Sequence, residues 1–233
     1  MVDCTIVAES ALVEWIISRG LTDYADAISR MEGRAESIAC HQADEMIWLL
    51  EHPSLFTTGT ATCEDDFAED PPFPVFQTGR GGRVTYHGPG QRIIYTMLDL
   101  RQRGRDVRHF VRQCEQWVIE SLSQLGVVSG RNPPHTGVWT WHQGHQVKLA
   151  AMGFRIRRWV TFHGISINVN PDLNHYRSIV PCGIRSHGVT SLTDVGYKID
   201  MADLDTALQM AFDSCFETTP SRRLFDPDSL FEG

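Results

Sequence analysis

Lysine is almost absent from this sequence. Among its 233 residues are 21 lysines and arginines, and only Lys148 and Lys198 are lysines. Arginine supplies the positive charge elsewhere, so a retained lysine is expected to need something that arginine lacks: it can give up a proton, or favour a thiolate while charged. The surroundings of Lys148 predict the edge of a packed strand, whereas Lys198 is expected in a solvent-facing turn. Nucleotide bias would instead leave lysines at random.

Several other features are missing. No apolar run approaches the ~20 residues of a membrane span, and the first residues carry acids where a leader peptide carries bases, so we expect a cytoplasmic protein with no membrane association. The six cysteines form no C-x-x-C pair, which disfavours both a disulfide framework and a zinc ribbon. The pair His142 and His145 has no neighbouring ligands, so no metal is expected.

Internal repeats and low-complexity segments are absent as well. The apolar and charged fractions, 42% and 21%, are typical of a globular protein. We expect one domain over residues 1–233.

Charge is unevenly distributed along the chain. Residues 1–70 carry a net charge of −12, residues 71–160 carry +9 and residues 161–233 carry −5. The basic middle, with 101–112 and 155–158, suits either an anionic partner or a solvated face balanced by the acidic ends after folding. A nucleic acid is not expected, because the chain is acidic as a whole and lacks a recognition motif.

Hydrophobic patterns predict both helices and strands. Residues 22–31 are expected to form a helix capped by Thr22, residues 45–53 a buried strand ended by Pro53, residues 65–74 a loop and residues 92–100 a core strand.

The second half continues the mixture. A helix is expected over 106–125, ended by Gly126, and its apolar stripe places Cys114 in the core. A second helix is expected over 203–216 after an Asp cap, and it places Cys215 on a packing face. Residues 137–158 predict two strands around a turn, and residues 162–170 predict a half-buried strand. The order of elements predicts an α+β fold with a mostly antiparallel or mixed sheet.

Two stretches carry candidate chemistry. "RGGRVTYHGPGQ" (80–91) has more glycine than a hairpin needs, which indicates either close approach of a ligand to the backbone or a turn that stabilises the sheet. "IVPCGI" places Cys182 in a loop between Pro181 and Gly183, where it is either a nucleophile or a small buried hydrophobe.

These stretches together resemble one enzyme family. "WLLEHPSLFTTG" (48–59), "RGGRVTYHGPGQ", "KLAAMGFRIRRWVTFHGISINVN" (148–170) and "PCGI" are similar, in this order, to the signature blocks of the lipoyl(octanoyl) transferase family, the octanoyl-acyl-carrier-protein:protein N-octanoyltransferases. The likeness runs from about Ala43 to Leu192, and residues 1–42 and 193–233 match only in general layout.

The resemblance implies an α+β fold shared with biotin and lipoate protein ligases, with mixed sheets flanked by helices. It implies that Cys182 takes an octanoyl or lipoyl group from the phosphopantetheine thioester of acyl-carrier protein, with Lys148 as the acid/base partner. The acceptor is then a lysine on lipoyl domains of 2-oxoacid dehydrogenase complexes or on glycine cleavage H protein, with no bound cofactor. An ATP-dependent lipoate or biotin ligase is the alternative enzyme, and a scaffold without activity is the alternative of another class.

The same resemblance implies a substrate-binding site. Small residues there leave room for an aliphatic chain, while Arg80 and His87 either position the substrate or satisfy buried carbonyls. The predicted residues, with Gly88 added to the first wall, are Arg80, Gly81, Gly82, Arg83, Val84, Thr85, Tyr86 and His87 on one wall and Ala151, Met152, Gly153, Gly164, Ile165 and Ser166 on the other.

Overall fold

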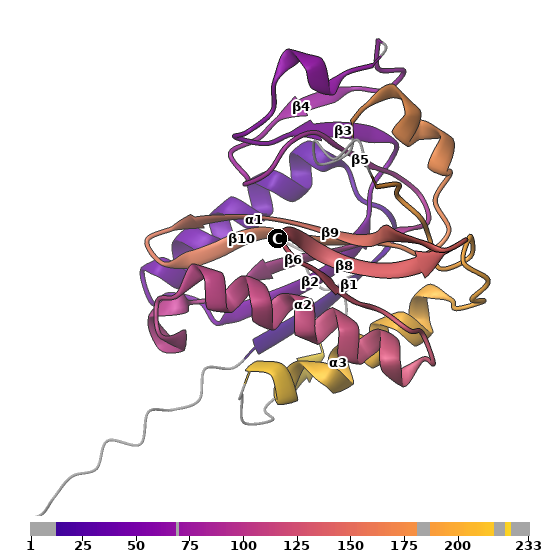
Figure 1. The fold of residues 1–233 in the computed structure, drawn as a ribbon. Helices are drawn as coiled ribbons and strands as arrows, with labels where there is room; N and C mark the ends of the chain where they lie inside the picture. Colours follow the sequence, from indigo (N-terminus) through magenta and orange to yellow (C-terminus); the bar gives the residue numbers. More distant parts are fainter. Residues whose placement is uncertain (1–12, 69, 181–186, 217–221, 225–233) are drawn as a thin grey trace, which may run out of the picture.

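The computed structural model describes residues 13–68, 70–180, 187–216 and 222–224. Within them the chain forms an eight-stranded sheet in the order β11-β1-β2-β6-β10-β9-β8-β7 and a three-stranded sheet in the order β4-β3-β5. Figure 1 shows the small sheet lying above the large one. The large sheet is mixed, because β1 pairs in parallel with β2 and β11 while the pairs from β2 to β7 are antiparallel. The prediction of an α+β fold with a mixed sheet is confirmed.

The bounds of the elements follow. The strands of the large sheet are β1 (Val13–Leu21), β2 (Glu45–Glu51), β6 (Gln91–Met97), β7 (Gly130–Asn132), β8 (His135–His142), β9 (His145–Arg157), β10 (Val160–Asn168) and β11 (Arg222–Leu224). The small sheet consists of β3 (Leu55–Thr58), β4 (Val75–Gln77) and β5 (Thr85–His87). The helices are α1 (Tyr24–Ala39), α2 (Val107–Gln124) and α3 (Met201–Phe216), with short 3₁₀ turns η1 (Glu64–Asp66), η2 (Leu100–Arg103) and η3 (Leu173–Ser178).

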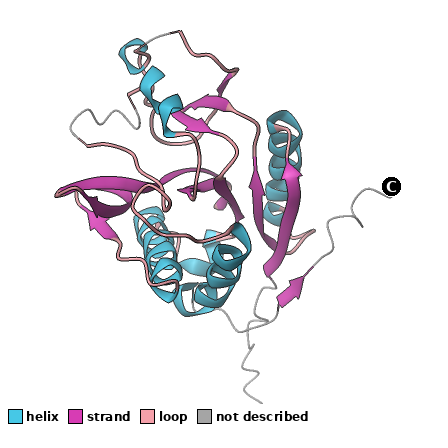
Figure 2. Cartoon of the chain, turned by 90° about the vertical axis from the view of Figure 1, so that its right-hand side faces the viewer, coloured by secondary structure: helices cyan, strands magenta, loops and turns pink. Residues whose placement is uncertain are grey.

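Helices cover both faces of the large sheet. Helix α1 packs on one face, against β2, β6 and β10, and helices α2 and α3 pack on the other. Figure 2 shows helices on both sides of the strands. The central strands are therefore buried on both faces, and the expectation that residues 162–170 form a half-buried strand is wrong. Ser166 and Asn168 are polar but buried, so alternation along the strand did not mark a solvent face.

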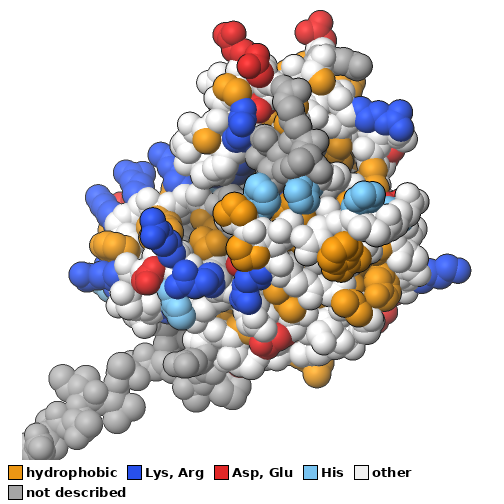
Figure 3. All heavy atoms as spheres, viewed as in Figure 1, with side chains coloured by type: hydrophobic (Ala, Val, Ile, Leu, Met, Phe, Trp, Pro, Cys, Tyr) orange, Lys and Arg blue, Asp and Glu red, His pale blue; other side chains and the backbone are white. Residues whose placement is uncertain are grey.

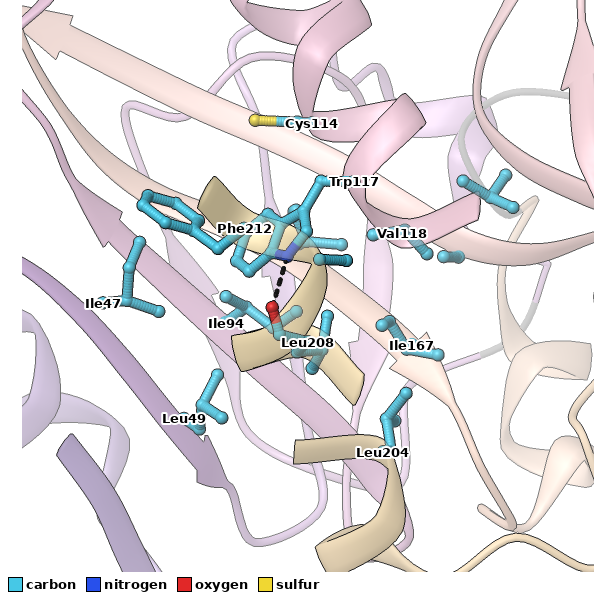
Figure 4. Packing of buried hydrophobic residues seen from close by; sticks show 14 of the residues in the cluster. Ile47, Leu49, Ile94, Cys114, Trp117, Val118, Ile167, Leu204, Leu208 and Phe212 are labelled. Atoms are coloured by element: carbon cyan, nitrogen blue, oxygen red, sulfur yellow. Dashed lines mark hydrogen bonds between the residues drawn. The ribbon is translucent and has the colours of Figure 1, made fainter. Parts of the chain in front are cut away.

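The larger core lies between the sheet and helices α2 and α3. Trp117 of α2 is fully buried, and its ring meets Trp15 and Phe212 edge-on at centroid distances of 6.0 and 5.2 Å. The indole Nε1 donates a hydrogen bond of 2.8 Å to the carbonyl of Leu208 on α3, drawn as a dashed line in Figure 4. Packing and one directed bond together fix α2 against α3.

Helix ends follow local capping chemistry, with one correction. Helix α1 is capped by the side chain of Asp23, which accepts from the N–H groups of Ala25 and Asp26, and not by Thr22. The helix also extends beyond residue 31 to Ala39, because buried Ala35 and Ile38 continue the apolar stripe.

The other elements agree with their predictions. The helix predicted over 106–125 is α2, capped by Asp106, and Cys114 is buried. Helix α3 begins at Met201, two residues before the predicted start, and Asp200 caps it by accepting from the N–H of Asp203. Strands β2 and β6 and the pair β8 and β9 form where strands were predicted, and loop 65–74 contains the end of η1.

The basic middle of the chain is partly balanced in space. Arg155 and Arg158 form ion pairs with Glu32 and Glu36, both on the exposed side of α1. Figure 3 shows Lys and Arg side chains gathered on the left of the face that it draws. These pairs support a balanced, solvated face at residues 155–158, and an anionic partner stays a prediction.

The structure describes no membrane-spanning helix: within its described residues, none combines the length and apolar character that a crossing needs.

We predict that Trp117→Phe lowers the free energy of unfolding by about 1–3 kcal/mol, because it removes buried volume and the bond to Leu208. Urea denaturation followed by circular dichroism measures the change. Trp141→Phe is the matched control, because Trp141 is 63% exposed and its replacement should shift stability by no more than about 0.5 kcal/mol. Equal effects of the two variants would contradict the packing described for Trp117.

Candidate active site

A cavity of about 260 Å³ lies between the loop that precedes β5 and the central strands of the large sheet. For comparison, a cavity of about 150 Å³ is enough to hold benzene. Its lining comes from β5, β6, β9 and β10, from the segment around residues 134–136 and from the start of α1. Figure 3 shows histidine side chains gathered below the small sheet on this side of the molecule. The space is large enough for a short aliphatic chain.

Most of the predicted substrate-binding residues meet at this cavity. Its lining includes Arg80, Gly82, Arg83, Thr85, His87, Ala151, Met152, Gly153, Gly164, Ile165 and Ser166. Gly81, Val84 and Tyr86 do not line it. Val84 and Tyr86 point to the opposite side of β5, as alternation along a strand requires, and pack with Phe56 in the core of the small sheet.

Glycine brings the loop and the sheet together. The N–H of Gly81 donates a 2.8 Å hydrogen bond to the carbonyl of Phe154 on β9. A Cβ on Gly153 would lie 3.0 Å from the carbonyl oxygen of Gly81, so a side chain at this position on β9 would crowd the loop. At Gly88 a Cβ would collide with the Tyr86 hydroxyl at 1.9 Å. Gly153 therefore favours close backbone approach at the cavity.

Lys148 lies on β9, lines the cavity and is 7% exposed. Its Nζ donates a 3.0 Å hydrogen bond to the carbonyl of Thr136 and lies 4.9 Å from the ring centroid of Trp139. Among the described residues no carboxylate forms an ion pair with it. Lys198 is exposed, as predicted. The two lysines thus lie in opposite environments, and only the buried one adjoins the cavity.

Cys182 lies outside the described residues, so its predicted role is not tested by geometry. The chain on both sides of it is described. Val180 donates from its N–H to the carbonyl of Asp66 at 2.7 Å, and the carbonyl of Gly188 accepts from the N–H of Lys148 at 2.9 Å. Gly188, close to where the described chain resumes, is therefore hydrogen-bonded to Lys148 itself.

Three neutral histidines lie at or beside the cavity: His163 is buried and lines it, half-buried His87 lines it, and buried His52 lies next to His87 with ring centroids 6.3 Å apart. Burial lowers the pKa of His87 to about 3, that of His163 to about 3 and that of His52 to about 4. His87 Nδ1 donates to Gln91 Oε1 at 2.6 Å, and His52 Nδ1 donates to the carbonyl of Thr22 at 2.7 Å. Their hydrogen bonds suit rings with a single proton.

Arg80 is nearly buried and uses its guanidinium within the protein. Nη2 donates to the carbonyl of Thr57 at 2.7 Å and to its hydroxyl at 2.8 Å, and Nη1 donates to the carbonyl of Gly81 at 3.0 Å. Arg80 therefore satisfies buried carbonyls while it also lines the cavity. The two roles proposed from the sequence are compatible.

Sequence reasoning missed several lining residues. They are Tyr24, Ile93, Tyr95, Pro134, His135, Thr136 and His163. Ile93 and Tyr95 alternate on a predicted strand, so the strand pattern could have placed them on the same face. His163 directly precedes the predicted Gly164, so its position in the sequence could have marked it. His163 also has a left-handed backbone, with φ of 60°, which is uncommon for a residue with a side chain. Tyr24 reaches the cavity from α1, and no local pattern marks it.

Metal ligands are not assembled at this site. Among the described residues no group of three or more His, Cys, Asp and Glu side chains is placed to hold an ion. His142 lies on β8 at 3.9 Å from a carboxylate oxygen of Asp194, a surface pair rather than a ligand cluster. The described donors do not suit a metal centre.

The fold agrees with comparisons to known proteins. The sequence model of the lipoyl protein ligase A/B catalytic domain matches residues 23–213, so this chain belongs to that family. A structure of the bipartite archaeal lipoate protein ligase from Thermoplasma acidophilum superposes with a TM-score of 0.66 at 15% identity, covering 95% of this chain and 90% of the other. At that identity the likeness supports the fold alone. The predicted ligase-like fold, with mixed sheets flanked by helices, is confirmed.

Curated relatives are more specific. The octanoyltransferase of Maricaulis maris is 51% identical over 219 residues, which covers 93% of this chain and 96% of the relative. The octanoyltransferase of a Bradyrhizobium strain is 52% identical over 211 residues, which covers 88% of both chains. These relatives confirm the resemblance stated from the sequence blocks and the prediction of an acyltransferase.

We predict that acid weakens the fold through the buried histidines. The unfolded chain takes up protons near pH 6.5, whereas the folded histidines resist them down to about pH 4 or 3. The unfolded state thus binds more protons, and the free energy of unfolding falls as pH decreases below about 6.5, by up to about 1.4 kcal/mol per pH unit for each histidine. Urea unfolding at pH 7, 6 and 5 measures the slope.

His87→Gln should reduce the dependence of the free energy of unfolding on pH by the contribution of one histidine, up to about 1.4 kcal/mol per pH unit. The control is His145→Gln, because His145 is exposed in the turn between β8 and β9. A slope that His87→Gln leaves unchanged would contradict a buried neutral ring at this position.

Proposed function

We propose that this chain transfers an octanoyl or lipoyl group from acyl-carrier protein to a lysine of a lipoyl domain through an acyl thioester on Cys182. Octanoyl transfer in protein lipoylation is supported by the curated octanoyltransferases at about 50% identity. The cysteine intermediate, the carrier-protein donor and the roles of individual residues form the proposal. We further propose a single catalytic domain, a cytoplasmic location and no bound cofactor.

The first step exchanges one thioester for another. The thiolate of Cys182 attacks the carbonyl carbon of the donor, a new S–C bond forms and the bond to the phosphopantetheine sulfur breaks. The departing thiolate takes a proton from the Lys148 ammonium. Because a thioester is exchanged for a thioester, no ATP is required.

The second step forms an amide. The neutral ε-amine of the acceptor lysine attacks the acyl carbon, the C–N bond forms and the C–S bond to Cys182 breaks. The amine loses a proton to neutral Lys148, which becomes an ammonium again while Cys182 returns as a thiolate. One group thus has to donate and accept a proton in each cycle, which is a role that arginine cannot fill.

One observation carries the proposal. Lys148 is buried in the lining of the cavity, and its backbone pairs with Gly188 in the segment that follows Cys182. We propose that an acyl chain in the cavity presents its carbonyl to Lys148. The walls suit the chain, with Ile93, Ala151 and Met152 contributing apolar surface.

The partners follow from the same chemistry. We propose acyl-carrier protein as the donor and lipoyl domains of 2-oxoacid dehydrogenase complexes, or glycine cleavage H protein, as acceptors. An ATP-dependent ligase of the same fold is the alternative, and it predicts transfer of free octanoate only in the presence of ATP.

We predict a covalent intermediate. Incubation with octanoyl-carrier protein and no acceptor should add one octanoyl mass to the intact enzyme, located by peptide mass spectrometry on Cys182. Cys182→Ala should abolish both the adduct and the transfer. Cys114→Ala is the control, since Cys114 is buried in the core and burial raises its pKa well above the usual range. Label on Cys114, or full transfer without any label, would overturn the intermediate.

We predict that Lys148→Arg is nearly as inactive as Lys148→Ala, with transfer reduced at least about 100-fold in both, since arginine keeps its proton. The assay is ATP-free transfer from octanoyl-carrier protein to an apo lipoyl domain. Lys198→Ala is the matched control and should retain full activity, because Lys198 is exposed and does not line the cavity. Substantial transfer by Lys148→Arg would show that positive charge alone suffices.

A further inference from the structure

Glu115 is a buried carboxylate that the reaction described above does not use. It lies on α2 and is 6% exposed. Its Oε1 accepts a 2.9 Å hydrogen bond from the N–H of Gly137, and its Oε2 accepts one of 3.1 Å from Arg131 Nε. Burying a carboxylate is costly unless it is paired and hydrogen-bonded, and these two partners meet that requirement.

The bond to Gly137 connects Glu115 with Lys148 through one peptide group. The peptide between Thr136 and Gly137 presents its N–H to Glu115 Oε1 and its carbonyl oxygen to Lys148 Nζ at 3.0 Å. The N–H and C=O of a trans peptide point in opposite directions in one plane, so the orientation of one fixes the other. A carboxylate that holds the N–H therefore also aims the carbonyl at the lysine.

Only glycine fits at the second residue of this peptide. Gly137 has φ of 125°, and a Cβ there would lie 2.6 Å from the carbonyl oxygen of Ala150 on β9. The pairing of β8 with β9 also shifts register between Val138 and Trp139, immediately after this glycine. The backbone thus departs from the regular pairing of β8 with β9 next to the Thr136 carbonyl that accepts from Lys148 Nζ.

We propose that Glu115 is a positioning residue for Lys148. Its carboxylate holds the Thr136–Gly137 peptide so that the Thr136 carbonyl directs Nζ toward the end of the cavity where the acyl carbon reacts. This inference rests on the proposed role of Lys148 as the proton carrier. Glu115 itself contacts neither substrate nor the reacting atoms. Its contribution is geometric, and a displacement of about 1 Å in a reacting group can reduce the rate about 100-fold.

Replacement of Glu115 should therefore lower kcat without changing substrate binding. We expect Glu115→Leu to reduce kcat for transfer to an apo lipoyl domain by about 10- to 100-fold, with KM for the acceptor within about 2-fold of the native value. Glu115→Gln should retain kcat within about 5-fold, because its amide oxygen can still accept from Gly137. A purely structural role would not produce this split or this rescue.

Arg131→Met is the matched control. It removes the ion pair with Glu115 but leaves the bond to Gly137, so kcat should stay within about 2-fold of the native value. Should Glu115→Leu fail to fold, Glu115→Asp carries the test, because it keeps the charge and is one methylene too short to hold Gly137. We expect at least a 5-fold loss of kcat for that variant, on the same positional argument.

The Lys148→Ala background separates this inference from the proposed function. If Glu115 acts through Lys148, adding Glu115→Leu to Lys148→Ala should change the residual rate by less than about 2-fold. Native kcat for both Glu115→Leu and Glu115→Asp, an equal loss for Arg131→Met, or a full additional loss in the Lys148→Ala background would each overturn the positioning role. Native activity of Lys148→Ala alone would instead refute the proposed function.

Discussion

The cavity depends on a backbone contact between the loop before β5 and strand β9. Pairing of β8 with β9 ends at Ala150, so the edge of β9 beyond that point accepts another partner, and the N–H of Gly81 bonds there to the carbonyl of Phe154. Glycine at position 153 leaves room for this contact, because a Cβ there would lie 3.0 Å from the carbonyl oxygen of Gly81. This contact holds the loop beside β9. The loop residues Arg80 and Gly82 and the β5 residue Thr85 line the cavity together with Ala151 and Met152 of β9.

The chemistry of the walls follows from burial on both faces of the large sheet. Burial lowers the pKa values of His52, His87 and His163, so their rings are neutral. The neutral rings and the apolar side chains beside them suit an acyl chain, and the positive charges in the lining come from Arg80, Arg83 and Lys148. The same burial makes the anchoring of Lys148 depend on specific contacts with Thr136 and Trp139. The amine of Lys148 is thereby held by neutral partners.

Features encoded within short stretches were predictable from the sequence, and features assembled across the fold were not. Helix α2 and the strand pair β8 and β9 follow from periodicity, and the contrast between Lys148 and Lys198 follows from their neighbours. Family resemblance placed Arg80 and Gly153 on opposing walls before the structure did. Tyr24 escaped notice because it reaches the cavity only through the packing of α1. The burial of β10 on both faces likewise depends on α1, and Cys182 lies outside the described residues.

The most direct test of the account is a crystal structure of the enzyme after acylation by octanoyl-carrier protein without an acceptor. We predict an octanoyl chain between the loop of residues 80–85 and Met152, joined as a thioester to Cys182, with its carbonyl within hydrogen-bonding distance of Lys148 Nζ, about 3 Å. This arrangement would place chain, nucleophile and proton carrier in one site. An acyl chain bound outside the cavity, or a thioester carbonyl remote from Lys148, would contradict the account.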